Sequence, residues 1–308
     1  MSTRKWILLL LALVMIAQTA SAQDTTSAKD TTQIIGWKKS LLFDLTTTQT
    51  AYSDSWVGGE AGSFTWVSNL NGNAERQFSS KVNYSTVLKL SFGQTHIQDE
   101  ETKNWSKPKK STDLIDWDNM FRFTMGGFVD PYAAFRLESQ FYTEHTLAVR
   151  DKRAYFRPLK LTESAGIAKR IYTGAGTDNV TSRLGMAVRQ VINSVFDSVT
   201  YAPKEDSYSD GGLESVTDVS LTLNKQITYI GKLSFFKALF FSEKDKVEGT
   251  EFEDDWKAVD VNFENQFNVS VIKVVTVKLY TQVLYDKQVS KKGRFKETLG
   301  LGLAYKIW

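Results

Sequence analysis

Side chains that could act as general bases or nucleophiles are few in this chain and form no recognisable catalytic group. His96 and His145 are the only histidines, and cysteine is absent, which excludes thiol catalysis and cysteine-ligated metal sites. The sequence has no G-x-S-x-G, H-E-x-x-H or phosphate-loop motif. A base without an identified nucleophile is no catalytic constellation, so we expect no enzymatic activity, no cofactor and no metal site.

Four charged residues lie on the polar faces of predicted strands, namely Arg136, Glu138, Glu264 and Lys278. If these strands form a barrel, strand parity directs the four side chains into its lumen. There they could line a polar pathway and tune its selectivity, or they could form a charge network that fills a narrow interior. Both alternatives remain open from the sequence.

A short glycine-containing segment follows the first predicted strand and includes Trp56, Gly58, Gly59 and Glu60. Adjacent glycines permit positive φ and close backbone approach. The segment could fold back into the mouth of a barrel, with Glu60 as a polar contact. The alternative is a structural turn or bulge, with Trp56 in an aromatic girdle.

Two charged loops have weaker claims to function. Residues 242–255 carry seven carboxylates interrupted by Lys244 and Lys246, but the EF-hand spacing for Ca²⁺ is missing, so a solvated loop is favoured. Lys107, Lys109 and Lys110 could contact lipopolysaccharide phosphates, although a solvated loop is again favoured.

The elements that would position these residues are strands. Alternating apolar and polar residues predict twelve of them, several with the roughly 9–11 residues that a tilted membrane strand needs. They cover residues 37–49, 62–74, 81–96, 113–125, 132–142, 164–172, 180–196, 214–226, 231–241, 256–271, 274–287 and 294–308.

The predicted connections alternate in length along the chain. Those after even-numbered strands are short, whereas those after odd-numbered strands are mostly long, with 288–293 as the exception. Outer-membrane barrels have short periplasmic turns and longer outer loops. Aromatic residues near strand ends are typical of interfacial girdles, although soluble β cores also contain such rings.

The last predicted strand has one consistently apolar face, which includes Leu299, Leu301, Leu303, Tyr305 and Ile307. A chain that ends on such a strand is typical of outer-membrane barrels. We expect Leu301, Leu303, Tyr305, Ile307 and Trp308 to serve as the signal for the barrel-assembly machinery and the strand to close against strand one.

The N-terminus has the pattern of a secretory signal. Arg4 and Lys5 precede the apolar segment 6–17, and Ala20-Ser21-Ala22 is a cleavage site. We expect a signal peptide at 1–22, a flexible periplasmic lead-in at 23–36 and a barrel at 37–308. The net charge of +3 is too near neutral to indicate nucleic-acid binding.

Several short segments resemble those of a Bacteroidetes family of outer-membrane β-barrels of unknown function. Its members share an Asn-Trp-x-x-Gly-Gly-Glu-like segment, which is similar to 55–60 here, with Ser55 for Asn and only Val57 before the glycines. The other segments are 109–113 (KKSTD), 182–185 (SRLG), 212–217 (GLESVT), 285–286 (YD) and 301–306 (LGLAYK). The resemblance implies a barrel and a diderm cell envelope but no activity.

The sequence therefore predicts an all-β protein, a single closed antiparallel transmembrane barrel in the outer membrane of a diderm bacterium. Both termini would be periplasmic, and outer-membrane lipid and lipopolysaccharide would surround the wall. A passive channel or uptake barrel is the favoured function. A structural or adaptor barrel with an envelope protein partner is the main alternative, and a membrane-embedded enzyme comes third. A soluble periplasmic β protein is the rival fold.

Overall fold

The described part of the chain is almost entirely β structure. A computed structural model describes residues 36–52, 61–146, 151–176, 178–196 and 203–307. The chain divides into the units Met1–Gln33 and Ile34–Trp308, and all described residues belong to the second. Among these residues there is no helix of the length and apolar character needed to cross a membrane.

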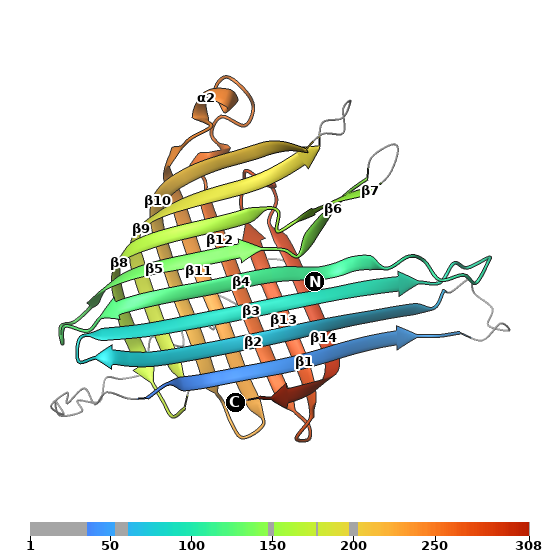
Figure 1. The fold of residues 1–308 in the computed structure, drawn as a ribbon, viewed down its shortest axis with the longest axis horizontal. Coiled ribbons are helices and arrows are strands. Elements are labelled where there is room, and N and C mark those ends of the chain that lie inside the picture. Colours follow the sequence, from blue (N-terminus) through green and yellow to red (C-terminus); the bar gives the residue numbers. More distant parts are fainter. Residues whose placement is uncertain (1–35, 53–60, 147–150, 177, 197–202, 308) are drawn as a thin grey trace, which may run out of the picture. The chain divides into compact units, whose positions relative to one another are not determined.

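Twelve strands of the described residues close into one antiparallel barrel, which confirms the predicted fold class (Figure 1). Around the wall they follow the order β1-β14-β13-β12-β11-β10-β9-β8-β5-β4-β3-β2. The barrel strands are β1 (Lys38–Thr50), β2 (Ser63–Ser79), β3 (Val82–Ile97), β4 (Lys109–Phe123), β5 (Asp130–Ser139), β8 (Leu159–Thr173), β9 (Asn179–Phe196), β10 (Pro203–Thr222), β11 (Ile227–Phe241), β12 (Val259–Ser270), β13 (Val275–Tyr285) and β14 (Arg294–Lys306).

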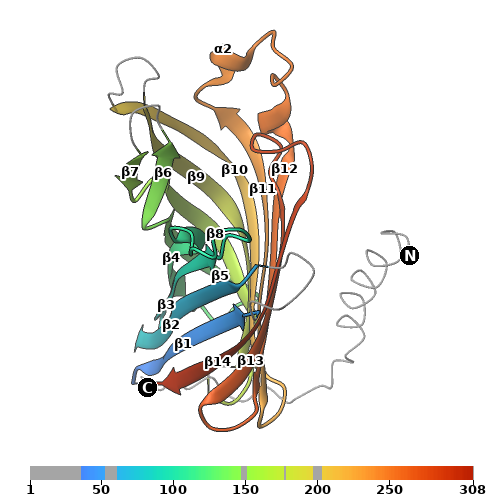
Figure 2. The ribbon, with the colours of Figure 1, turned by 90° about the vertical axis from the view of Figure 1, so that its right-hand side faces the viewer.

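Three small elements belong to the connections rather than to the wall. They are the hairpin of β6 (Tyr142–Thr146) and β7 (Asp151–Tyr155), the single helical turn α2 (Lys244–Val247) and the 3-10 turn η1 (Asp255–Lys257). Figure 2 shows α2 and the hairpin at one end of the barrel and the C-terminus at the other.

The two ends of the barrel differ in the length of their connections, as the sequence predicts. The connections at one end are 80–81, 124–129, 174–178, 223–226 and 271–274, and this end also holds the start of β1 and the end of β14. The opposite end carries 51–62, 98–108, 140–158, 197–202, 242–258 and 286–293, and these are longer with the exception of 197–202, which has the length of 124–129. We call these the short-turn end and the long-loop end.

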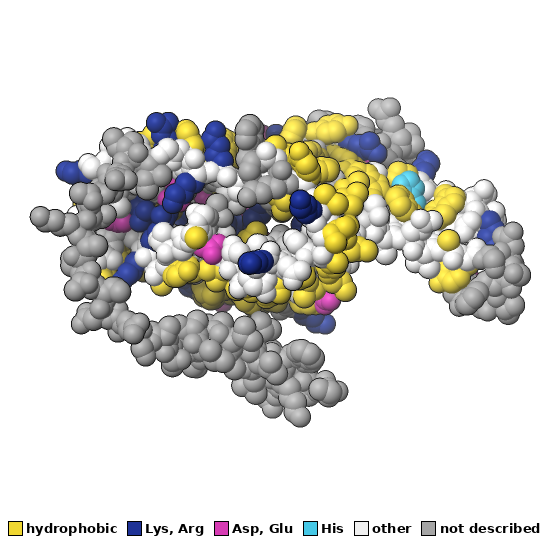
Figure 3. All heavy atoms as spheres, turned by 90° about the horizontal axis from the view of Figure 1, so that it is seen from below, with side chains coloured by type: hydrophobic (Ala, Val, Ile, Leu, Met, Phe, Trp, Pro, Cys, Tyr) yellow, Lys and Arg dark blue, Asp and Glu magenta, His cyan; other side chains and the backbone are white. Residues whose placement is uncertain are grey.

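Apolar side chains cover the outer face of the wall, and polar side chains face the lumen. On β12, for instance, Glu264 and Asn268 are buried while Val259 and Phe267 are exposed. Figure 3 shows hydrophobic side chains gathered along the outside of the wall. The exposed apolar side chains come from strands around the whole barrel, including Phe43, Leu45, Ile167, Leu184, Met186, Phe235, Phe267, Val283, Leu299 and Leu301.

The structure corrects two of the predicted connections. Residues 203–213 were expected to be part of a long loop but form the first half of β10, so the predicted loop 197–213 shrinks to 197–202. This half of β10 pairs with β9 from Pro203↔Phe196 onward. Its sequence is polar on both faces, so backbone pairing creates a strand there without apolar alternation.

The second correction is the β6–β7 hairpin within the predicted connection 143–163. Asp113 anchors the approach to this hairpin, because its Oδ1 and Oδ2 accept hydrogen bonds from the backbone N–H groups of Phe141 and Tyr142, at 2.6 and 3.3 Å. Lys110 Nζ donates to Asp113 Oδ2 at 3.0 Å and to Gln140 Oε1 at 2.9 Å. Lys110, a candidate for phosphate contact, is therefore engaged in holding the hairpin.

Two glycines allow β8 and β9 to approach closely. Gly166 and Gly185 are register partners. A Cβ added to Gly185 would collide with the carbonyl oxygen of Ala165 and lie 2.7 Å from Tyr132 Oη. Tyr132 is only 3% exposed, so it has little space into which it can move.

We predict that Gly185→Val destabilises the barrel by about 1–3 kcal/mol, because the added atoms overpack this contact. The measurement is urea unfolding of the refolded protein. Gly127→Val is the control, since a Cβ there would have only one neighbour, Val129 O at 3.6 Å. Equal stability of the two variants would contradict the predicted close approach.

Candidate functional site in the barrel lumen

The lumen is crossed by charged side chains that pair with partners on other strands. We call the set near mid-height the charge layer. Neighbouring strands place its members side by side, as in the register pairs Lys89↔Asp116, Asp116↔Glu138 and Lys232↔Glu264. The layer consists of Lys89, Asp116, Asp118, Arg136, Glu138, Arg183, Lys232 and Glu264.

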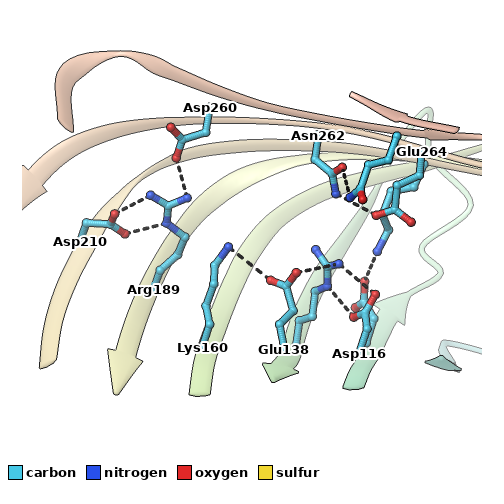
Figure 4. Close-up of polar contacts among 12 residues, drawn as sticks. Asp116, Glu138, Lys160, Arg189, Asp210, Asp260, Asn262 and Glu264 are labelled. Carbon is cyan, nitrogen blue, oxygen red and sulfur yellow. Dashed lines mark hydrogen bonds and ion pairs between the residues drawn. The ribbon is translucent and has the colours of Figure 1, made fainter. Parts of the chain in front are cut away.

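The first part of the layer runs along β4, β5 and β8. Arg136 binds Asp116 through two hydrogen bonds, Nε to Oδ1 at 2.8 Å and Nη2 to Oδ2 at 3.0 Å. Its Nη2 is also 3.1 Å from Glu138 Oε1, and Glu138 Oε2 is 3.3 Å from Lys160 Nζ (Figure 4). Because Asp116 and Glu138 are like charges in directly opposed positions, Arg136 offsets a repulsion that would otherwise oppose strand pairing.

The second part of the layer centres on Asp118 and crosses the lumen. Arg183, on β9, donates from Nη1 and Nη2 to the two Asp118 oxygens at 3.3 and 3.0 Å. Lys232, on β11, donates to Asp118 Oδ2 at 3.2 Å. All three side chains are buried and come from strands that are not neighbours. Two cations on one buried carboxylate leave no uncompensated negative charge at this point.

A third contact connects two further walls. Lys89 Nζ, on β3, is 3.1 Å from Glu264 Oε2 on β12, and β3 and β12 are far apart in the strand order. Asn262 Nδ2 donates to Glu264 Oε1 at 2.8 Å and so occupies the other carboxylate oxygen (Figure 4). The layer thus ties opposite sides of the barrel together.

Two cavities lie on either side of this layer. A cavity of about 370 Å³ lies toward the long-loop end, and its wall includes Asn69, Asp116, Glu264 and Lys278. A cavity of about 140 Å³ lies toward the short-turn end, with Glu75, Asp118, Arg170 and Arg183 in its wall. The two share Lys89, Ile230, Gly231 and Lys232. Charged side chains therefore narrow the lumen between two polar chambers.

Further ion pairs lie nearer the ends of the barrel. Toward the long-loop end, Arg189 Nε donates to Asp210 Oδ1 at 2.7 Å and Nη1 donates to Asp260 Oδ2 at 2.8 Å (Figure 4). Toward the short-turn end, Arg170 Nη2 lies 2.6 Å from Glu75 Oε1. The interior is thus polar at several levels, which agrees with the apolar outer face.

The structure brings the four predicted lumen residues into this network. Arg136, Glu138 and Glu264 belong to the charge layer, and Lys278 Nζ lies 3.3 Å from Asp44 Oδ2. Whether they act on a solute stays a prediction. The outer-loop residues Trp56, Gly58, Gly59 and Glu60 lie outside the described residues, as does Trp308. Leu301, Leu303, Tyr305 and Ile307 are exposed on the outer face, and their role in assembly stays a prediction.

Some carboxylates of the acidic loop 242–255 form ion pairs with lysines. Asp255 is buried and pairs with Lys287 at 2.8 Å, while exposed Glu251 pairs with Lys291 at 2.7 Å. In the described part of the chain, no group of three or more His, Asp or Glu side chains is placed to hold a metal ion.

Sequence reasoning did not single out Lys89, Asp116, Asp118, Arg183 and Lys232 as site residues, although the pattern held a signal for the two aspartates. Asp116 and Asp118 flank Trp117 in a predicted strand, so both carboxylates share one face. Their partners could not be assigned, because Arg183 and Lys232 come from distant strands and only barrel closure brings them to Asp118.

Comparison with protein families finds a similarity over part of the chain. Residues 47–145 match the family described as "Protein of unknown function (DUF3078)". This range contains the 55–60 and 109–113 segments, and the chain is similar to the family over that stretch. No curated protein matches the chain.

The solved structures to which the chain is similar include the following three, all at low sequence identity. An outer membrane channel from Pseudomonas putida F1 is 13% identical, with 92% of this chain and 99% of that chain covered and a TM-score of 0.37. The β domain of the Bordetella autotransporter BrkA is 11% identical, with 89% and 99% covered and a TM-score of 0.34. The translocator domain of autotransporter NalP from Neisseria meningitidis is 10% identical, with 98% and 96% covered and a TM-score of 0.36.

We predict that Asp118→Asn lowers the free energy of unfolding by about 3–5 kcal/mol, because buried Arg183 and Lys232 lose their nearest carboxylate and keep only the longer contacts to Glu214 at 4.0 Å and Asp218 at 3.7 Å. Urea unfolding measures the effect. The control is Glu251→Gln in the exposed pair with Lys291, where we expect a loss of at most about 1 kcal/mol. Similar small losses in both variants would show that the charge layer does not hold the barrel together.

Proposed function

We propose that this chain is an outer-membrane β-barrel of a diderm bacterium that acts as an uptake barrel of low conductance. The apolar outer face supports the location, because a water-soluble monomer rarely exposes apolar side chains all around its wall. Barrel closure supports it further, since a closed sheet leaves few backbone groups to lipid.

The proposed orientation places the short-turn end in the periplasm. Outer-membrane barrels have short periplasmic turns and longer outer loops, and this barrel has that asymmetry. The start of β1 and the end of β14 lie at the short-turn end, so both would be periplasmic. The β6–β7 hairpin and α2 would then lie outside the cell.

The observation that carries the functional proposal is the charge layer between two cavities. An open porin would leave its lumen free, whereas here Lys89–Glu264 and Lys232–Asp118 join opposite walls. A barrel filled only for stability would have no need of a polar chamber of about 370 Å³, a volume within the range of about 300–1,000 Å³ that ligand sites occupy. The geometry therefore favours a narrow, occluded passage over a general pore.

The membrane location is tested by an arginine on the outer wall. Leu184, on β9, is 53% exposed, and Leu184→Arg should destabilise the barrel in phospholipid vesicles by about 2–4 kcal/mol. Val289→Arg is the matched control, because Val289 is also exposed but lies in the connection 286–293. If guanidinium unfolding shows no loss for either variant, or if the protein stays soluble without detergent, the wall faces water and the soluble fold is correct.

The passage is tested by single-channel recording in planar bilayers. We expect a small, discrete conductance for the native chain and a several-fold larger one for Lys89→Met with Glu264→Gln, because the double replacement removes a cross-lumen pair without leaving an unpaired charge. Lys291→Met with Glu251→Gln, in an exposed loop pair, should leave conductance unchanged.

Two outcomes would contradict the proposal of a narrow, occluded passage. Absence of conductance from the folded native chain and from the lumen variant would favour the structural or adaptor barrel. A large native conductance would show that the charge layer does not occlude the lumen.

A further inference from the structure

The seam between β1 and β14, which closes the barrel, has a hydrogen-bonded ladder along only part of its length. We call the remaining part the unzipped segment. β1 pairs with β2 from Lys38↔Glu75 to Thr50↔Ser63, which is its whole length. Its pairing with β14 covers only Leu42↔Lys306 to Thr46↔Gly302. Figure 1 shows β1 running at a steep angle to β14. Toward the long-loop end, the structure describes no strand pairing between 47–50 on β1 and 294–301 on β14.

At the point where the ladder stops, β1 and β14 approach closely on the lumen side. Gly300 has no side chain where Thr46 passes over it, and an added Cβ would collide with Thr46 Cγ2. The close approach of the two strands is thus concentrated at this crossing. Beyond it, no ladder joins the facing backbone edges within the part of the chain that the structure describes, and in lipid unpaired backbone groups are costly unless something covers them.

The larger cavity lies directly behind this unzipped segment. Its wall includes Thr46 on β1 and Lys296, Thr298 and Gly300 on β14. The outer faces of the same part of β14 are apolar, because Leu299 and Leu301 are 66% and 59% exposed. The polar cavity and the apolar outer surface of β14 thus lie on the two sides of the segment where β1 and β14 are not paired.

One cation in the chamber differs from the others. Each carboxylate in its wall already has a basic partner, in the pairs Asp113–Lys110, Asp116–Arg136, Glu138–Lys160 and Glu264–Lys89. Among the described residues, Lys296 Nζ has neither an ion pair nor a hydrogen bond, and it lies 6.0 Å from the centroid of the Tyr280 ring. The chamber therefore offers one positive charge for an anionic group.

From this arrangement we infer that the chamber binds a single-chain anionic amphiphile and that the unzipped β1–β14 seam is its lateral exit to the bilayer. The anionic head contacts Lys296, and the alkyl chain passes between 47–50 and 294–301 to lie along Leu299 and Leu301. This inference rests on the proposed membrane location, and it adds the class of substrate and the route to the proposed uptake function.

The seam itself is tested with cysteine pairs, which are the only thiols because the native chain has no cysteine. Leu45→Cys with Leu303→Cys joins register partners and should form a disulfide under mild oxidation. Thr47→Cys with Leu301→Cys is the next pair of the same type and should cross-link at least about tenfold more slowly. Equal cross-linking rates for the two pairs would show that the β1–β14 ladder continues and would contradict the proposed lateral exit.

The ligand is tested by photolabelling with dodecanoate that carries a diazirine near its head, in phosphatidylcholine nanodiscs. We expect adducts on the lumen side of 294–301, and an approximately tenfold reduction in Lys296→Gln, because a charge-assisted contact is lost. Lys292→Gln, in the neighbouring loop, is the control and should label as the native chain does. Diazirine-bearing dodecanol should label the lumen side of the native chain as weakly as dodecanoate labels Lys296→Gln.

Two failures have different meanings. If the chain enters nanodiscs but dodecanoate labels the outer wall evenly and Lys296→Gln has no effect, the amphiphile site is wrong and the membrane location stands. If the chain does not enter nanodiscs at all, the proposed membrane location is wrong, and the proposed lateral exit is then wrong as well.

Discussion

Backbone hydrogen bonding is the constraint on which the rest of this structure depends. A sheet that faces an apolar medium must satisfy its own N–H and C=O groups, and closing β1 against β14 removes the two free edges. Closure fixes which face of each strand points inward, and the alternation of side chains then sorts apolar residues outward and polar residues inward. The unzipped part of the seam is where this demand is met least completely among the described residues.

The charge layer follows from that sorting. Once the inward faces carry Asp116, Asp118, Arg136 and Lys232, closure brings them within reach of one another in a confined space. Buried charges are costly unless paired, and each carboxylate that lines the larger cavity has a basic partner. The same pairs narrow the lumen, which links the stability of the barrel to what can pass through it.

The sequence predicted strands best where the two faces meet different environments. The alternation in 256–271 predicted β12 to within a few residues, because Val261 and Phe263 face outward while Asn262 and Glu264 face the lumen. It failed for 203–213, where β10 continues with polar residues on both faces and only the pairing with β9 defines the strand. It also failed for the β6–β7 hairpin, whose approach is held by Asp113 and Lys110 from a different strand.

The candidate site divides in the same way. The inward direction of Arg136, Glu138, Glu264 and Lys278 follows from strand parity, a local property of the sequence. Which carboxylate each cation binds depends on the strand order and on contacts across the lumen. Lys89 and Glu264 are far apart in the chain, and only closure brings their charged groups to 3.1 Å.

By itself, the sequence determined the all-β class, the approximate strands, the alternation of connection lengths and the polar character of the interior. These depend on the period of two along a strand, which each segment carries independently. Only the tertiary structure decided that the lumen is divided by ion pairs, that Lys296 Nζ has neither an ion pair nor a hydrogen bond among the described residues and that the β1–β14 ladder stops at Thr46↔Gly302. These features depend on how strand tilt and register add up around a closed wall, and no single segment encodes that sum.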